Sequence, residues 1–194
     1  MILNSDDGFV KISKLLAAGQ LSIFAGSGIS VNSGLPTWDG FVDKYIEICE
    51  KLNSCIPDEL KFDSIINDAK SSYKNKNLID TVTALKEKIK CCKVNGINVD
   101  FCDDMLNQLF YSAKCNDYHR IIVSTAYKHI ITTNYDNLLE DAANELGYNK
   151  LLTSSYSYVD HQAISASIYS GNSAIIHAHG KIADIKLDQF VLTK

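Results

Sequence analysis

Hydrophobic residues along the chain switch between helical spacing and short uninterrupted runs. Near the start, apolar residues recur at three- and four-residue intervals up to Ala17, which predicts an amphipathic helix that Gly19 ends. The next run, LSIFA at residues 21–25, is apolar almost throughout, as in a buried strand. Helical spacing returns over residues 41–52. The first quarter of the chain therefore predicts a helix, a strand, a loop and a second helix.

The rest of the chain repeats this alternation after a helical segment. Residues 53–116 carry apolar positions at helical spacing, so we expect a helical insertion there. KHIITTNYD at 128–136 and AIIHAHG at 174–180 each predict a buried strand, and a helix closed by Gly147 follows the first of them. The stretch between that helix and the last strand has no clear period. Three strands alternating with helices predict an α/β fold, a Rossmann-like parallel sheet flanked by helices.

Each predicted strand ends in a polar or glycine-containing loop. The three loops read GSGIS, TNYD and HG. In parallel α/β sheets, ligands bind beyond the carboxyl ends of the strands. We therefore expect these three loops to meet in one ligand site.

Composition narrows the classes of function. The formal net charge is −4 and no basic run occurs, so the broad positive footprint of a nucleic-acid-binding protein is missing. No apolar stretch reaches the roughly 20 residues that cross a bilayer, and the opening MILNSDDGF does not read as a signal peptide. The six cysteines form no C-x-x-C pair. We expect a cytoplasmic protein with reduced thiols, no metal and no membrane segment.

Two glycines at the first strand end suggest a phosphate. Gly26 and Gly28 remove side chains where backbone amides can approach an anion, although an ordinary tight turn explains them equally well. The dinucleotide fingerprint G-x-G-x-x-G is not met, because Val31 stands at its third glycine. The glycines alone leave both interpretations open.

Polar residues at the other two strand ends suit a catalytic site. Asn134 and Asp136 follow an apolar strand and precede a helix, so either can simply cap that helix. His179 lies beside Gly180 where the sheet is expected to bind its ligand, and an imidazole exchanges protons near neutral pH. If the strand continues, His177 lies on the same face as His179. We interpret His119, His129 and His161 as structural, and Trp38 either packs under its loop or walls a planar ligand.

Taken in order, FAGSGISVNSGLPTW, IITTNYD and IIHAHG resemble the sirtuin superfamily, and more closely its bacterial sirtuin-like branch found in antiphage defence proteins. The resemblance runs from about residue 10 to residue 194 and implies one sirtuin-like NAD-binding domain over 1–194, C-terminally incomplete. It also implies Asn134 and His179 as catalytic residues. The residues that it implies around NAD+ are Ala25, Gly26, Ser27, Gly28, Ile29, Pro36, Trp38, Thr133, Asp136 and Gly180.

Departures from the deacylating sirtuins bear on the reaction. Those enzymes carry Gln where this chain has Thr133, an Asp-Phe-Arg run where it has residues 37–39, and a four-cysteine zinc module after the histidine motif, where this chain has no cysteine. The resemblance therefore implies an NAD+ glycohydrolase that releases nicotinamide and ADP-ribose or a cyclised form, depletes NAD in antiphage defence, and works as a homo-oligomer or with a fused or partner sensor domain. An NAD or ADP-ribose sensor without turnover is the alternative, and a protein deacylase is the weakest.

Overall fold

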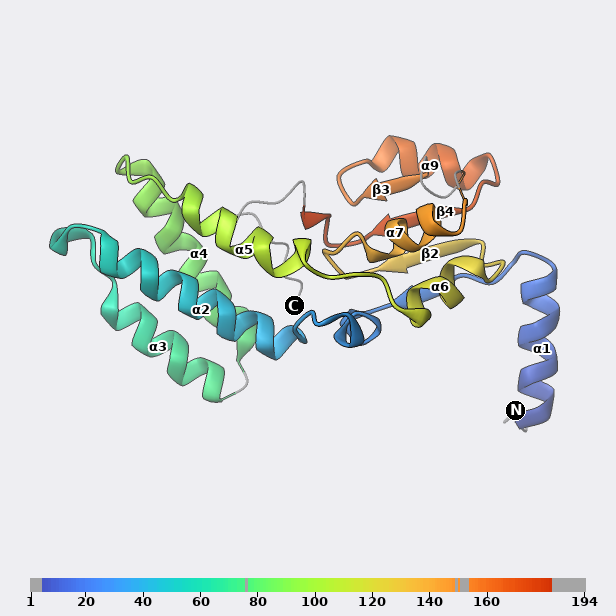
Figure 1. Cartoon of the computed structure of the whole chain (residues 1–194), viewed down its shortest axis with the longest axis horizontal. Coiled ribbons are helices and arrows are strands. Elements are labelled where there is room, and N and C mark those ends of the chain that lie inside the picture. The colour runs from blue at the N-terminus through green and yellow to red at the C-terminus, as the bar shows by residue number, and fades with distance from the viewer. Residues whose placement is uncertain (1–4, 76, 149, 151–153, 183–194) are drawn as a thin grey trace. The chain divides into compact units, whose positions relative to one another are not determined.

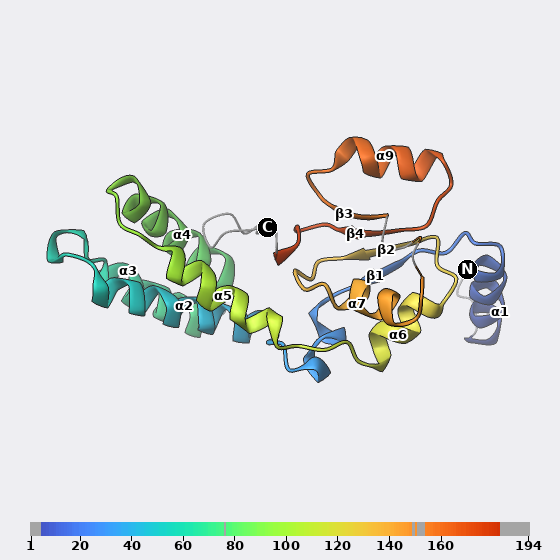
Figure 2. The same cartoon turned by 45° about the horizontal axis from the view of Figure 1, so that its top comes forward.

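The fold is seen in a computed structural model that describes residues 5–75, 77–148, 150 and 154–182. The described residues form two compact units. The first consists of the chain up to Ser33 together with Lys114–Lys181, and the second of Gly34–Ala113 together with Ile182. Figure 1 labels most helices and strands of both units, and Figure 2 also labels β1.

A four-stranded parallel sheet is the centre of the first unit. Its strands are β1 (Ile23–Ala25), β2 (His129–Thr132), β3 (Ser155–Ser157) and β4 (Ala174–His177), in the order β1-β2-β4-β3. Ile130 of β2 and Ile175 of β4 are register partners, and both side chains are buried. Buried apolar positions on neighbouring strands stabilise the sheet by removing this surface from water.

Helices cover the two faces of this sheet as its topology requires. Steps from β1 to β2 and from β2 to β3 run in one direction across the sheet, whereas the step from β3 to β4 runs back. Because such crossovers are right-handed, the reversal puts the last helix on the opposite face. Figure 2 shows α9 (His161–Tyr169) on one face, and α6 (Asp117–Ser124) and α7 (Leu138–Glu145) on the other.

The remaining elements of the first unit lead into and out of β1. The helix α1 (Ser5–Ala17) ends before Gly19, which has a φ of +62° and so takes the left-handed conformation that closes many helices. Two short 3-10 helices, η1 (Ser27–Ile29) and η2 (Val31–Ser33), follow β1. They place the GSGIS segment at the carboxyl end of the sheet.

The second unit is helical in its described part. It contains α2 (Trp38–Cys55), η3 (Asp58–Leu60), α3 (Asp63–Lys74), α4 (Leu78–Val94) and α5 (Asp100–Tyr111). The predicted segment 53–116 covers α3, α4 and α5, while α2 packs with them. That these helices form an insertion within a single domain remains our proposal. Their core contains Tyr45, Leu52, Leu85, Ile89 and Leu106.

The predicted α/β class, with a parallel sheet flanked by helices, is confirmed. Two details of the prediction were wrong. A fourth strand, β3, lies in the stretch that showed no period, and the last strand ends at His177, with residues 178–179 in a turn. His179 therefore does not continue the alternation of β4, and no shared face with His177 follows from it.

We also searched the described segments for membrane-spanning helices and for metal-binding groups. None of their helices is both long and apolar enough to span a membrane. Within the same segments, no group of three or more His, Cys, Asp or Glu side chains is placed to hold a metal ion.

Candidate functional site

The three predicted loops follow strands that end in register. Ala25 pairs with Thr132, and Thr132 pairs with His177. The hydrogen bonding continues one step further, since the amide of Thr133 donates to the carbonyl of Ala25 at 3.2 Å. The loops Gly26–Ser30, Thr133–Asp136 and His177–Gly180 thus leave the same edge of the sheet, and we call them together the strand-end site.

The fold itself does not require glycine at positions 26 and 28. Gly26 has an extended backbone with φ −116° and ψ −176°, and neither glycine is among those with positive φ. A Cβ on Gly26 would only touch the Thr133 hydroxyl at 3.9 Å, and one on Gly28 would meet no described atom within 4 Å. By contrast, Gly180 has a φ of +92°, which favours glycine for conformational reasons alone. The space beside Gly26 and Gly28 is open for a ligand to approach the backbone.

Ser30 connects three buried side chains at the strand-end site. Its hydroxyl donates to Asp136 Oδ2 at 2.9 Å and lies 3.2 Å from His119 Nε2. The side-chain amide of Asn134 donates to the same hydroxyl oxygen at 3.0 Å. All four residues are buried, with exposed fractions between 0% for His119 and 6% for Asn134 and Asp136.

Hydrogen-bond accounting assigns the protons of this cluster. His119 Nδ1 accepts from the backbone amide of Asn116 at 3.1 Å, so in the neutral ring the hydrogen is on Nε2 and points to Ser30. Burial, followed by the charge of Arg120, lowers the pKa of His119 to about 4, which keeps the ring neutral. A hydroxyl donates once and accepts twice, so Ser30 is fully paired.

The same accounting leaves one acceptor of Asn134 without a partner in the described part of the chain. Its backbone amide donates to Thr132 Oγ1 at 3.0 Å, its backbone carbonyl faces His177 Nδ1 at 3.0 Å, and its Nδ2 donates to Ser30. Its Oδ1 is buried without a hydrogen-bond partner among the described residues. Buried acceptors without a partner are uncommon in folded proteins. Asn134 therefore offers an acceptor to a hydroxyl group or a water molecule.

The Asp136 carboxylate contacts both the first turn of α7 and the buried Ser30 cluster. Its Oδ1 accepts from the amide of Leu138 at 3.2 Å, at the first turn of α7, as the capping alternative predicted. Its Oδ2 accepts from Ser30 at 2.9 Å. Burial raises the pKa of Asp136, and the hydrogen bonds from Ser30 and Leu138 partly oppose this shift. Each carboxylate oxygen can still accept a second hydrogen bond.

His179 lies in the turn after β4. Its ring packs near that of Tyr135, with the ring centres 6.2 Å apart and the planes tilted by 37°. Burial lowers the pKa of His179 below its usual 6.5, so the ring is mostly neutral at pH 7 and can accept a proton.

His177, the last residue of β4, is fully buried. A carbonyl only accepts, so His177 Nδ1 donates to the carbonyl of Asn134, while Nε2 lies 2.8 Å from Glu140 Oε1. Burial acts to raise the pKa of Glu140, but hydrogen bonds from His177 and Ser155 and the charges of His177 and Lys181 lower it to about 2. The His177 ring thus lies between the backbone carbonyl of Asn134 and the Glu140 carboxylate.

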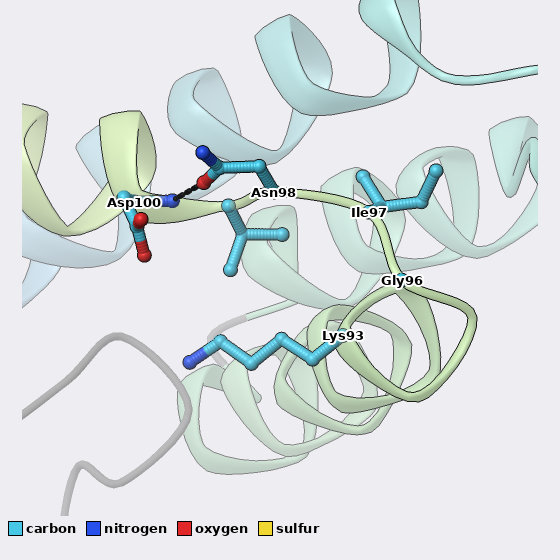
Figure 3. Close-up of a pocket in the computed structure, with 6 residues that line it drawn as sticks. Lys93, Gly96, Ile97, Asn98 and Asp100 are labelled. Atoms are coloured by element: carbon cyan, nitrogen blue, oxygen red, sulfur yellow. Dashed lines mark hydrogen bonds between the residues drawn. The ribbon is translucent and has the colours of Figure 1, made fainter.

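Pro36 and Trp38 belong to the second unit. The Trp38 ring stacks on Phe41 with centres 5.5 Å apart, which favours the packing alternative for this residue. A hollow of about 350 Å³ in the same unit lies at the turn between α4 and α5. Figure 3 shows the residues that line this hollow: Lys93, Gly96, Ile97, Asn98, Val99 and Asp100. None of them is a predicted site residue.

Three residues of the site escaped the sequence analysis. Ser30 is the last letter of GSGIS, His119 was interpreted as structural only, and Glu140 was not singled out. A signal existed for His119, because Asn116 and His119 have capping-box spacing, and the structure shows both bonds of that box. Nothing in the sequence pairs His119 with Ser30, 89 residues away.

Comparison with known proteins found a family match for part of the chain. The family model for the SIR2-like domain matches residues 128–194, which include the TNYD and HG loops. The match supports a sirtuin-like domain in this chain, and SIR2-like domains bind NAD+. No curated protein matches the chain.

Proposed function

We propose that the strand-end site binds NAD+ as a substrate and hydrolyses its nicotinamide–ribose bond. One observation carries the proposal: Asn134 Oδ1 is a buried acceptor without a partner in the described chain, held at the edge where three loops meet. The SIR2-like match over residues 128–194 supports NAD+ as the ligand. The resemblance found in the sequence adds the roles of the individual residues.

The phosphates would lie against the first loop. The opening amides of a helix have no acceptor within it, and η1 begins at Ser27, between the two open glycines. Amides pointing out of such a turn bind anions. Gly26 and Gly28 let the dinucleotide come close to these donors, and Ala25 and Ile29 flank the loop.

Hydrolysis breaks the bond between ribose C1′ and the pyridine nitrogen, whose electron pair leaves with neutral nicotinamide. Positive charge grows on the ribose as the bond breaks, so the site gains most from holding the leaving group and placing one water. Asn134 Oδ1 would accept a hydrogen from that water or from a ribose hydroxyl. The water oxygen bonds to C1′, and its proton passes to His179, directly or through a ribose hydroxyl. Asp136 would accept from the nicotinamide amide.

The biological setting belongs to the same proposal. An enzyme that destroys NAD+ harms its own cell, which suits an effector in antiphage defence acting in the cytoplasm. We propose that it works as a homo-oligomer or under a sensor domain. Support comes from the motif resemblance to the bacterial defence branch and from the sequence departures from the deacylating sirtuins at residues 37–39 and at Thr133.

Chromatography of NAD+ incubated with the purified protein tests the reaction. We expect nicotinamide and ADP-ribose in equal amounts, and a cyclised product would be recognised by its lower mass, since no water is added. Calorimetry in parallel separates turnover from sensing. Tight binding of intact NAD+ without nicotinamide release would contradict the hydrolase proposal and support the alternative of an NAD sensor without turnover.

A further inference from the structure

The loop that carries Asn134 depends on contacts from neighbouring strands. Asn134 lies between the end of β2 at Thr132 and the start of α7 at Leu138, outside regular secondary structure. Its backbone is held at both polar atoms, the amide by Thr132 Oγ1 and the carbonyl by His177. Rotation of either flanking peptide would move the side chain that presents Oδ1.

The His177 ring is itself fixed from its other side. Nε2 lies 2.8 Å from Glu140 Oε1, in the first turn of α7. The same oxygen accepts from the hydroxyl of Ser155 on β3 and lies 3.4 Å from Lys181 Nζ. Lys181 Nζ also donates to the carbonyl of Ser155 at 3.3 Å. Residues of α7, β3, β4 and the segment after β4 thus converge on the Glu140 carboxylate.

We propose that His177 is a positioning residue, a ring that ties the backbone carbonyl of Asn134 to Glu140 and so holds Asn134 Oδ1 toward the substrate. The inference rests on the proposed function, because it assigns His177 a role in that reaction without contact to the reacting atoms. It differs from a stabilising role in that the bond to Asn134, rather than the contact with Glu140, controls the rate.

Two substitutions separate the two bonds. In His177→Asn the amide nitrogen takes the place of Nδ1 and keeps the bond to the Asn134 carbonyl, whereas in His177→Gln it takes the place of Nε2 and keeps only the bond to residue 140. Both are made in Glu140→Gln protein, because a lone buried carboxylate would destabilise the fold. The Glu140→Gln single variant is the reference.

We expect the Asn variant to keep kcat within about threefold of the reference. The Gln variant should lose about tenfold in kcat with KM changed less than about twofold, as expected for one hydrogen bond of roughly 1.4 kcal/mol. Circular dichroism and thermal unfolding must show both proteins folded. Equal kcat in the two folded variants, or a higher kcat in the Gln variant, would overturn the proposal.

Two spectroscopic readouts do not depend on turnover. If the wild-type protein releases no nicotinamide, the proposed function fails, yet the carbonyl ¹³C shift of labelled Asn134 should still change in the Gln variant and not in the Asn variant. If a variant does not fold, ¹H–¹⁵N spectra of the wild-type rings decide the question. A hydrogen on Nδ1 of His177 supports the proposal, and an Nδ1 without hydrogen contradicts it.

Discussion

The side-chain amide of Asn134 donates to Ser30 Oγ at 3.0 Å, and Oδ1 of the same amide is buried without a hydrogen-bond partner among the described residues. Ser30→Ala removes the shared partner of three buried groups. Each buried polar group without a partner costs about 1–3 kcal/mol, so we expect the free energy of unfolding to fall by at least about 2 kcal/mol. Urea denaturation measures it.

The control for this change is Ser54→Ala, on the exposed side of α2, where the hydroxyl donates to the carbonyl of Lys51 and lies 3.7 Å from the exposed Cys55 Sγ. It should alter stability by no more than about 0.5 kcal/mol. If Ser30→Ala were as mild as the control, the hydrogen-bond network would not hold the site.

Gly28→Ala should separate binding from folding. The added Cβ meets no described atom within 4 Å, and Gly28 lacks a positive φ, so stability should stay within about 1 kcal/mol of the wild type. If the phosphates of NAD+ approach this backbone, the methyl group should weaken NAD+ binding by tenfold or more, as measured by calorimetry. Gly8→Ala in α1, where a Cβ is equally unhindered, should leave binding unchanged. If Gly28→Ala and Gly8→Ala bind NAD+ with equal affinity, the phosphates do not lie against the first loop.

The lowered pKa of His119 predicts that the folded protein loses stability at acidic pH. Its pKa in the folded protein is lowered to about 4, whereas the unfolded chain takes up the proton near 6.5. Its contribution is therefore fully present above pH 6.5 and is lost as the pH falls toward 4, about 3 kcal/mol in total. Urea denaturation from pH 7 to 4.5 should show a smaller decline in His119→Gln than in the wild type. Parallel declines would argue against the neutral buried ring.

The lowered pKa of His179 predicts how kcat/KM changes at acidic pH. Burial lowers its pKa below 6.5, and the neutral ring is the form that accepts a proton. The value of kcat/KM should rise with pH through a midpoint below 6.5 and be level at neutral pH. A midpoint at or above 6.5, or an unchanged acid limb in His179→Ala, would assign the proton transfer to another group.

Long apolar patterns made most of the fold predictable from the sequence. The helices around Tyr45 and Leu139 and the strands at Ile130 and Ile175 are continuous in their periodicity, and their side chains are buried. The strand β3 was missed because its residues are Ser-Tyr-Ser at the edge of the sheet, where an apolar run is not needed. The end of β4 was misplaced because HAHG alternates like a strand although Gly180 turns the chain.

The sequence predicted where the candidate site lies but not the contacts within it. Strand ends located the three loops, since parallel strands direct their carboxyl ends to one edge of the sheet. The partners inside the site were not predictable, because Ser30 joins His119 and Asp136 across 89 and 106 residues. Such contacts depend on packing between distant segments, on which local periodicity carries no information.

Release of nicotinamide from NAD+ by the wild-type protein, compared with Asn134→Ala and His179→Ala, tests the central claim most directly. We predict measurable release by the wild type and a loss of at least about a hundredfold in each folded variant, in line with the usual effect of a lost general base. Undiminished release in both folded variants would contradict the assignment of the reaction to the strand-end site.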